Sequence, residues 1–126
     1  MKTNSEICEI AKRTLLVEAE GVLNLREHID QAFPAIVNLI LALSGRVVIT
    51  GIGKSAIIAQ KIVSTLNSTG TPAIFMHAAD AIHGDLGMIQ TNDLVICISN
   101  SGNTKEIKIL APLLKQAGNT LVGMVG

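Results

Sequence analysis

Residues 94–106, LVICISNSGNTKE, are the most informative segment of the chain. Five apolar residues come first, which is typical of a parallel strand buried on both faces. Hydroxyl side chains and a glycine follow, and then a helical segment whose first turn carries Glu106. A helix that begins at the carboxyl end of a strand directs unpaired N–H groups outward, where anions bind. The segment therefore predicts a strand, an anion-binding turn and a helix.

Short apolar runs alternate with helical segments from residue 46 onward. The pattern predicts strands over 46–50, 72–76, 93–99 and 120–125, helices over 55–68 and 104–117, and a short helix or turn over 79–87. One apolar stripe runs along each long helix: Ala59, Ile62, Val63 and Leu66 on the first, and Ile107, Leu110, Leu113 and Leu114 on the second. This alternation indicates the α/β class, with a flavodoxin-like parallel sheet in a three-layer αβα arrangement.

The amino-terminal part is helical in pattern. Thr3 and Glu6 have the spacing of a capping box, and apolar residues over 5–31 recur at helical intervals. Pro34 is expected to kink or restart the helix, with a further helical piece over 35–43. We therefore expect a helical part over 1–44 and a βαβ core over 45–126. The core is expected to be truncated, because an α/β domain normally continues into a helix after such a last strand.

Composition excludes several classes of function. The 126 residues suit one domain and carry ten basic and ten acidic residues, so no net charge attracts nucleic acid. Two Phe without Trp or Tyr leave little on which bases could stack. Cys8 and Cys97 have no metal-ligand spacing. Charged residues interrupt the amino terminus, which excludes a signal peptide, and the longest apolar run, 35–43, is too short to span a membrane. We expect a cytoplasmic protein without nucleic-acid or membrane partners.

The segment 51–56, GIGKSA, fits a loose dinucleotide-binding pattern after a strand. The acidic residue expected at the end of the next strand is missing, and the glycine that a P-loop requires at position 48 is valine. Two interpretations remain, a tight turn with Ser55 as helix cap or a turn that contacts a ligand.

The turn after residues 94–99 is rich in hydroxyl groups that suit a phosphate. The alternative is a plain helix cap by Asn103 or Thr104, with Glu106 completing a capping box. Capping needs only one or two of these residues, and adjacent parallel strands deliver their turns to one crevice. The residues expected to bind phosphate are Gly53, Ser55, Ser99, Ser101, Gly102 and Thr104.

The loop after the second predicted strand contains four acid–base side chains, His77, Asp80, His83 and Asp85. Acid–base or hydrogen-bonding work is the interpretation we favour for His83, with His77, Asp80 and Asp85 in supporting roles. Metal binding by His77 and His83 is disfavoured, because a six-residue separation in an irregular loop fixes no geometry. No metal site is predicted.

Three motifs together, GIGKS at 51–55, AIHGDLG at 81–87 and SNSGNTKE at 99–106, resemble the sugar isomerase (SIS) domain of D-arabinose 5-phosphate isomerases. The resemblance implies interconversion of D-ribulose 5-phosphate and D-arabinose 5-phosphate, which supplies the Kdo sugar of lipopolysaccharide. It also implies a homo-oligomer, a dimer or tetramer, that needs no metal or redox cofactor.

The resemblance assigns catalytic roles to Lys54, His83 and Glu106. Glu106 would shuttle a proton, His83 would assist ring opening or donate to the carbonyl oxygen, and Lys54 would stabilise negative charge. The chain departs from the family at Ala78 and Asp80, where Pro and Glu are usual. A further family histidine and the paired CBS modules that often follow are not in this sequence.

Two alternatives stay open at the level of sequence. One is a regulatory SIS domain that binds a sugar phosphate without catalysis. The other is an isomerase of a different phosphosugar, such as a hexulose 6-phosphate, because the motifs do not report the length of the substrate.

Overall fold

The computed structural model describes residues 2–126, which form two compact units, 2–37 and 38–126. The elements are α1 (Asn4–Asn24), the 3-10 helix η1 (Leu25–His28), α2 (Ala32–Leu41), β1 (Val47–Gly51), α3 (Lys54–Ser68), β2 (Ala73–His77), α4 (Ala78–Ile82), the 3-10 helix η2 (Asp85–Met88), β3 (Leu94–Ser99), α5 (Lys105–Gln116) and β4 (Thr120–Val125).

The predicted capping box begins α1. The Glu6 N–H donates to Thr3 Oγ1 at 3.3 Å, and the Thr3 N–H donates to Glu6 Oε2 at 2.6 Å. The helix ends at Asn24, so the predicted helical region 5–31 is one long helix followed by η1. Pro34 lies in the first turn of α2, where an N–H has no helical partner and its absence costs little.

The four strands form one parallel sheet in the order β2-β1-β3-β4. Each strand lies within one residue of its predicted ends, and the α/β class with a parallel sheet is confirmed. Strand β1 is central, and its Thr50 aligns with Met76 of β2 and Cys97 of β3. The turns that follow β1 and β3 therefore leave the sheet side by side, at its carboxyl edge.

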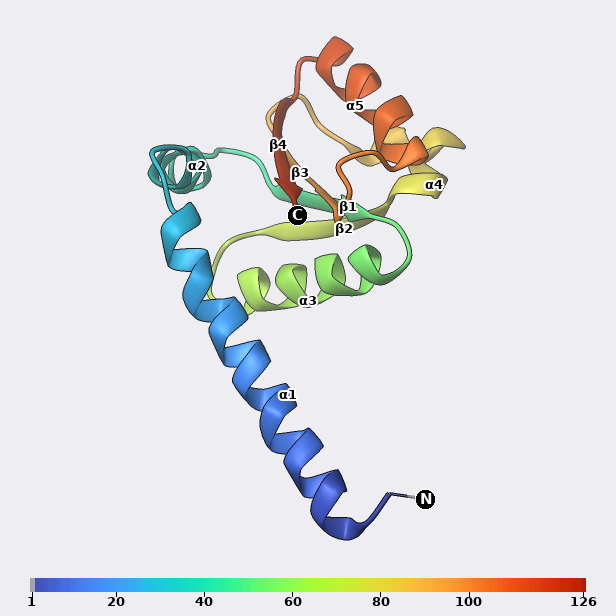
Figure 1. Ribbon diagram of the computed structural model, residues 1–126. Coiled ribbons are helices and arrows are strands. Elements are labelled where there is room, and N and C mark those ends of the chain that lie inside the picture. The colour runs from blue at the N-terminus through green and yellow to red at the C-terminus, as the bar shows by residue number, and fades with distance from the viewer. Residues whose placement is uncertain (1) are drawn as a thin grey trace. The chain divides into compact units, whose positions relative to one another are not determined.

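Helices cover both faces of the sheet, α3 on one and α4 with α5 on the other (Figure 1). Alternate residues of each strand point to opposite faces. Ile49 and Ile96 therefore pack with α3, whereas Val48 and Val95 pack with α4 and α5. The stripe predicted on α3 is confirmed, but the stripe on α5 is wrong at Leu113, which is 39% exposed because the helix turns it to the edge of its buried face.

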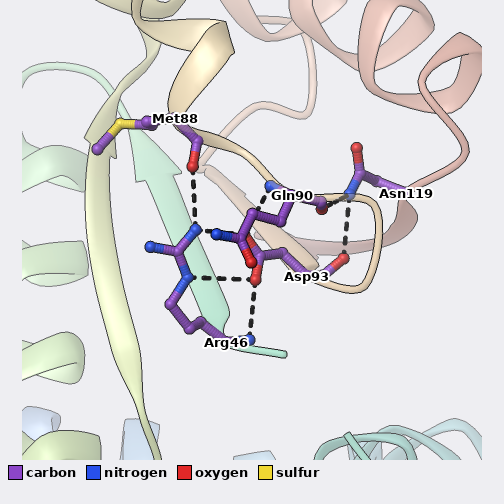
Figure 2. A network of polar contacts seen from close by, with 5 residues as sticks. All are labelled: Arg46, Met88, Gln90, Asp93 and Asn119. Carbon is purple, nitrogen blue, oxygen red and sulfur yellow. Dashed lines mark hydrogen bonds and ion pairs between the residues drawn. The ribbon is translucent and has the colours of Figure 1, made fainter. Parts of the chain in front are cut away.

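A polar network joins the opposite, amino-terminal ends of the strands (Figure 2). Asp93 is buried and accepts from the Arg46 guanidinium at 2.8 and 3.3 Å, from the Arg46 N–H at 2.9 Å and from the Gln90 N–H at 2.9 Å. The guanidinium also donates to the Met88 carbonyl at 2.9 Å. The Asn119 amide donates to the carbonyl oxygens of Gln90 and Asp93 at 2.7 and 3.2 Å. These bonds tie the start of β1 to the start of β3, and the start of β4 to the segment that leads into β3.

Burial alone would raise the pKa of the Asp93 carboxyl. The hydrogen bonds from Arg46 and from the N–H groups of Gln90 and Arg46 outweigh burial, so the pKa lies below its ordinary value. A carboxyl whose pKa is lower in the folded state stabilises the fold at neutral pH. That stabilisation is lost as the pH falls below the ordinary pKa and through the folded one.

Asp93→Ala leaves Arg46 and two N–H groups without their acceptor, and we expect it to lower the free energy of unfolding by about 3 kcal/mol at pH 7. Urea unfolding at pH 7 and at pH 3 measures the effect. The difference between wild type and variant should shrink at the lower pH, because the Asp93 carboxyl then binds a proton in the unfolded chain and so favours unfolding of the wild type. An equal difference at both pH values would contradict the role of the charge.

Candidate functional site

The turn after β1 is built by two glycines. A Cβ atom on Gly51 would lie 3.0 Å from the backbone carbonyl carbon of Ser55, so the chain turns back on itself too closely for a larger residue. Gly53 occupies the N-cap position of α3 with a φ of 58°, a conformation that favours glycine. The proposed capping by Ser55 is wrong, since α3 already begins at Lys54 and no side chain caps it.

The turn after β3 is rich in hydroxyl groups, and two of them bond to each other. Buried Ser99 and half-buried Thr104 share a hydrogen bond of 2.7 Å between their hydroxyl oxygens, and Ser101 Oγ accepts from the Asn103 N–H at 3.2 Å. Gly102 has a φ of 63°. Thr104 is the N-cap residue of α5 but makes no side-chain cap, so the predicted capping box with Glu106 does not form.

Both long helices thus present uncapped N-termini to the carboxyl edge of the sheet. Free backbone N–H groups and the positive end of the helix dipole are what an anion binds. Since no side chain caps α3 or α5, helix capping does not explain why these two turns are rich in glycine, serine and threonine.

A cavity of about 510 Å³ lies between the two turns, and we call it the first cavity. Lys54 and Ser55 line it from one turn, and Ser99 and Asn100 line it from the other. Its remaining wall is formed by Ile58, Ile98, Met124, Val125 and Gly126. Of the described residues that line it, Lys54 alone is ionisable, so the cavity has a positive character.

A second cavity, of about 260 Å³, lies between α4 and α5. His83, Lys105 and Glu106 line it together with the apolar side chains of Ala79, Ile82 and Ile109. Glu106 is half-buried, whereas His83 and Lys105 are exposed. The structure thus divides the three predicted catalytic residues: Lys54 lies at the first cavity, and His83 and Glu106 meet at the second.

Four of the six residues expected to bind phosphate line neither the first nor the second cavity. Thr104 bonds to Ser99, Ser101 and Gly53 are exposed, and Gly102 lines a smaller, mainly apolar cavity of about 160 Å³ between α5 and β4. The remaining two, Ser55 and Ser99, line the first cavity.

The supporting residues form a separate group on the loop after β2. His77 Nδ1 lies 3.8 Å from Asp80 Oδ2, is buried, and has no hydrogen-bond partner among the described residues. The His77 ring packs edge-on against Phe75 with centroids 6.3 Å apart. Asp85 is exposed at the start of η2. None of these three acid–base residues lines the first or the second cavity.

Two lining residues are additions to those predicted from the sequence, Asn100 in the first cavity and Lys105 in the second. Both belong to the segment 99–106, so the sequence places them near the site. The sequence does not show which cavity each side chain lines, because the path of a turn depends on tertiary packing.

Neither a metal cluster nor a membrane span is found in the part of the chain that the structure describes. Over residues 2–126, no group of three or more His, Cys, Asp and Glu side chains is placed to hold a metal ion. In the same residues, no helix combines the length and the apolar character needed to cross a bilayer.

Comparison with protein families gives a match to the SIS domain over residues 40–126. Among curated proteins, the chain is 46% identical over 126 residues to arabinose 5-phosphate isomerase KdsD of Pseudomonas aeruginosa, covering all of this chain and 39% of that protein. It is 44% identical over 115 residues to arabinose 5-phosphate isomerase GutQ of Escherichia coli K12, covering 91% of this chain and 36% of that protein. The chain thus spans little more than a third of these relatives.

Solved structures give the same picture. A protein of Escherichia coli CFT073, solved in complex with arabinose 5-phosphate, superposes with a TM-score of 0.94 at 39% identity, over 98% of this chain and 66% of that one. A putative sugar-phosphate isomerase of Listeria monocytogenes superposes with a TM-score of 0.94 at 34% identity, over 99% of this chain and 66% of that one.

Lys54→Met removes the positive charge from the first cavity, and we expect it to weaken binding of inorganic phosphate about 10- to 100-fold, since a hydrogen bond to a charged group contributes about 1.5–3 kcal/mol. Isothermal titration calorimetry measures the affinity. The matched control is Lys61→Met, an exposed lysine of the same helix that does not line the cavity. Equal losses in both variants would contradict a specific role for Lys54.

Proposed function

The chain belongs to the SIS domain family, and from this membership we propose that it forms the sugar-phosphate site of an aldose–ketose isomerase. The proposed reaction interconverts D-arabinose 5-phosphate and D-ribulose 5-phosphate. It would take place in the cytoplasm, where it would supply the precursor of Kdo for lipopolysaccharide, in a homo-oligomeric enzyme.

The observation that carries the proposal is the meeting of the uncapped N-terminus of α3, which includes Lys54, with Ser99 and Asn100 of the neighbouring turn at the first cavity. A phosphate dianion needs several N–H or O–H donors and a compensating positive charge. The free N–H groups at the start of α3, the Ser55 and Ser99 residues and the Lys54 charge meet that need. Lys54 would therefore act mainly on the charge of the phosphate group.

The second cavity supports the proton-transfer part of the reaction. In an open-chain pentose 5-phosphate, C3, C4 and C5 separate the reacting C1 and C2 from the phosphate oxygen. Groups that act on C1 and C2 must therefore lie away from the groups that hold the phosphate. The segment that leads from β3 into α5 contributes to both cavities, with Asn100 at the first and Glu106 at the second.

In the direction from aldose to ketose, the Glu106 carboxylate would take the proton from C2. The electron pair would move through C1 and C2 to the aldehyde oxygen, which becomes the oxygen of an enediol. His83 would donate to that oxygen, and a proton returned by Glu106 to C1, with loss of the proton on O2, would complete the ketose. The half-buried position of Glu106 beside His83 suits this pairing of a base with a donor.

Glu106→Gln tests the proposal. We expect the variant to lose about 100- to 10,000-fold in kcat, because an amide cannot accept the proton. Binding of ribulose 5-phosphate should persist, measured as an increase in Tm, since the first cavity is unchanged. A coupled isomerase assay on the protein expressed from its natural gene gives the rates, with Glu27→Gln, an exposed residue of η1, as the control.

Two results would contradict the proposal. Near-normal turnover by Glu106→Gln would exclude Glu106 as the base. A wild-type protein that is stabilised by ribulose 5-phosphate but isomerises no phosphosugar would instead be a regulatory binding domain. Turnover of a hexulose 6-phosphate in preference to the pentose would keep the mechanism and change the substrate.

A further inference from the structure

The proposed reaction develops negative charge on two oxygen atoms of the sugar, and Glu106 with His83 accounts for only one of them. From the aldose the charge forms on O1, where His83 would donate. From the ketose it forms on O2. A proton next to a carbonyl group is only weakly acidic, so a carboxylate removes it readily only where the resulting enediolate is stabilised. A positive charge within reach of O1 and O2 would supply that stabilisation.

The second cavity contains such a charge. Lys54 belongs to the first cavity, among the groups that would hold the phosphate. The lysine that lines the second cavity together with Glu106 and His83 is Lys105. The remaining lining residues are apolar: Ala79, Ile82 and Ile109. Apolar walls strengthen an electrostatic interaction, because they exclude water and lower the local dielectric constant. Lys105 is therefore the lysine that shares an apolar-walled cavity with the proposed base.

The Lys105 ammonium is not neutralised by the fold. Consecutive residues of a helix diverge by about 100°, so Lys105 and Glu106 line the cavity from different directions. Among residues 2–126, no ion pair joins Lys105 to Glu106 or to any other carboxylate. By contrast, Lys108, one turn further along α5, donates to Asn103 Oδ1 at 2.8 Å. Lys105 is exposed, so its charge is available to a ligand.

Helix stability does not explain a lysine at this position. Lys105 is the first residue of α5, where the positive end of the helix dipole disfavours a cation. Replacing it by an uncharged residue should therefore leave the stability of the helix unchanged or raise it. A loss of activity in such a variant would then reflect chemistry rather than folding.

We propose that the Lys105 ammonium contacts O1 and O2 of the bound sugar phosphate and stabilises the enediolate, an inference that rests on the proposed isomerase function. Glu106 takes the proton from C2, the C1=C2 bond forms, and O1 gains the carbonyl electron pair and a proton from His83. The C1=C2 pair then takes the proton back from Glu106 at C1. The O2–H pair becomes the second bond of the ketone, and the O2 proton restores His83. Lys105 transfers no proton and stays positive throughout.

Lys105→Met tests this role by separating kcat from KM. We expect kcat to fall about 10- to 100-fold, because a charged donor is lost where charge develops. The KM for D-arabinose 5-phosphate should stay within about threefold, since the first cavity holds the phosphate. Lys105→Arg keeps a cation and should recover most of the rate. The matched control is Lys108→Met, which removes the same charge from the same helix outside the cavity and should keep the wild-type kcat.

Binding of an intermediate analogue gives a measurement that needs no turnover. D-Arabinonate 5-phosphate has a carboxylate at C1, close to where the enediolate carries its charge, whereas D-arabinitol 5-phosphate has a neutral hydroxyl group there. Isothermal titration calorimetry should show that Lys105→Met weakens binding of the aldonate about 10- to 100-fold and binding of the alditol less than about threefold. Equal weakening of both ligands would mean that Lys105 serves the phosphate or the fold, which would overturn the proposal.

The outcomes distinguish this inference from the isomerase proposal. The assays use the protein expressed from its natural gene, and a wild type that isomerises no phosphosugar removes both. If Glu106→Gln is inactive but Lys105→Met keeps the wild-type kcat and aldonate affinity, the role of Lys105 alone is wrong. Equal effects of Lys105→Met and Lys108→Met would reduce the role to net charge and contradict it. A rate loss that comes with a lower Tm and that Lys105→Arg does not recover would show a structural role instead.

Discussion

The structure depends on the parallel pairing of β1 with β3. The register that aligns Val47 with Leu94 and Thr50 with Cys97 brings the ends of two strands level, so that two helices start side by side at one edge. Any other partner for β1 on that side would separate the Gly51–Gly53 turn from the hydroxyl-rich turn. The ion pair between half-buried Arg46 and buried Asp93 fixes the same two strands at their opposite ends, and so holds the register that the site needs.

The site that results is divided according to the chemistry of its substrate class. Phosphate binding calls for donors and positive charge, and the first cavity offers both at Lys54, at the N-terminus of α3 and at the turn that follows β3. Proton transfer calls for a carboxylate near a donor in a partly apolar setting, and the second cavity offers Glu106 with His83 between Ile82 and Ile109. The segment 99–106 contributes residues to both cavities, which explains why one short segment carries so much of the family resemblance.

Sequence patterns predict the backbone of this arrangement well. The strands are short, apolar and bounded by glycine and serine, and helical periodicity locates α3 and α5, because these features are local. Three details could not be read in this way. Whether Thr104 caps α5 depends on Ser99, which takes its hydroxyl, and whether Glu106 joins Lys54 depends on which face of the sheet each helix covers. Leu113 lies only one residue from a buried position, and spacing alone cannot place the edge of a stripe.

Amide chemical shifts test the central claim most directly, that two turns form one anion site at the carboxyl edge of the sheet. On titration with D-arabinose 5-phosphate, the N–H signals of Lys54 and Ser55 should move together with those of Lys105 and Glu106, at one dissociation constant. The N–H signals of Val47 and Leu94, at the amino edge, should stay in place. Shifts confined to one of the two turns, or centred on the amino edge, would contradict the account.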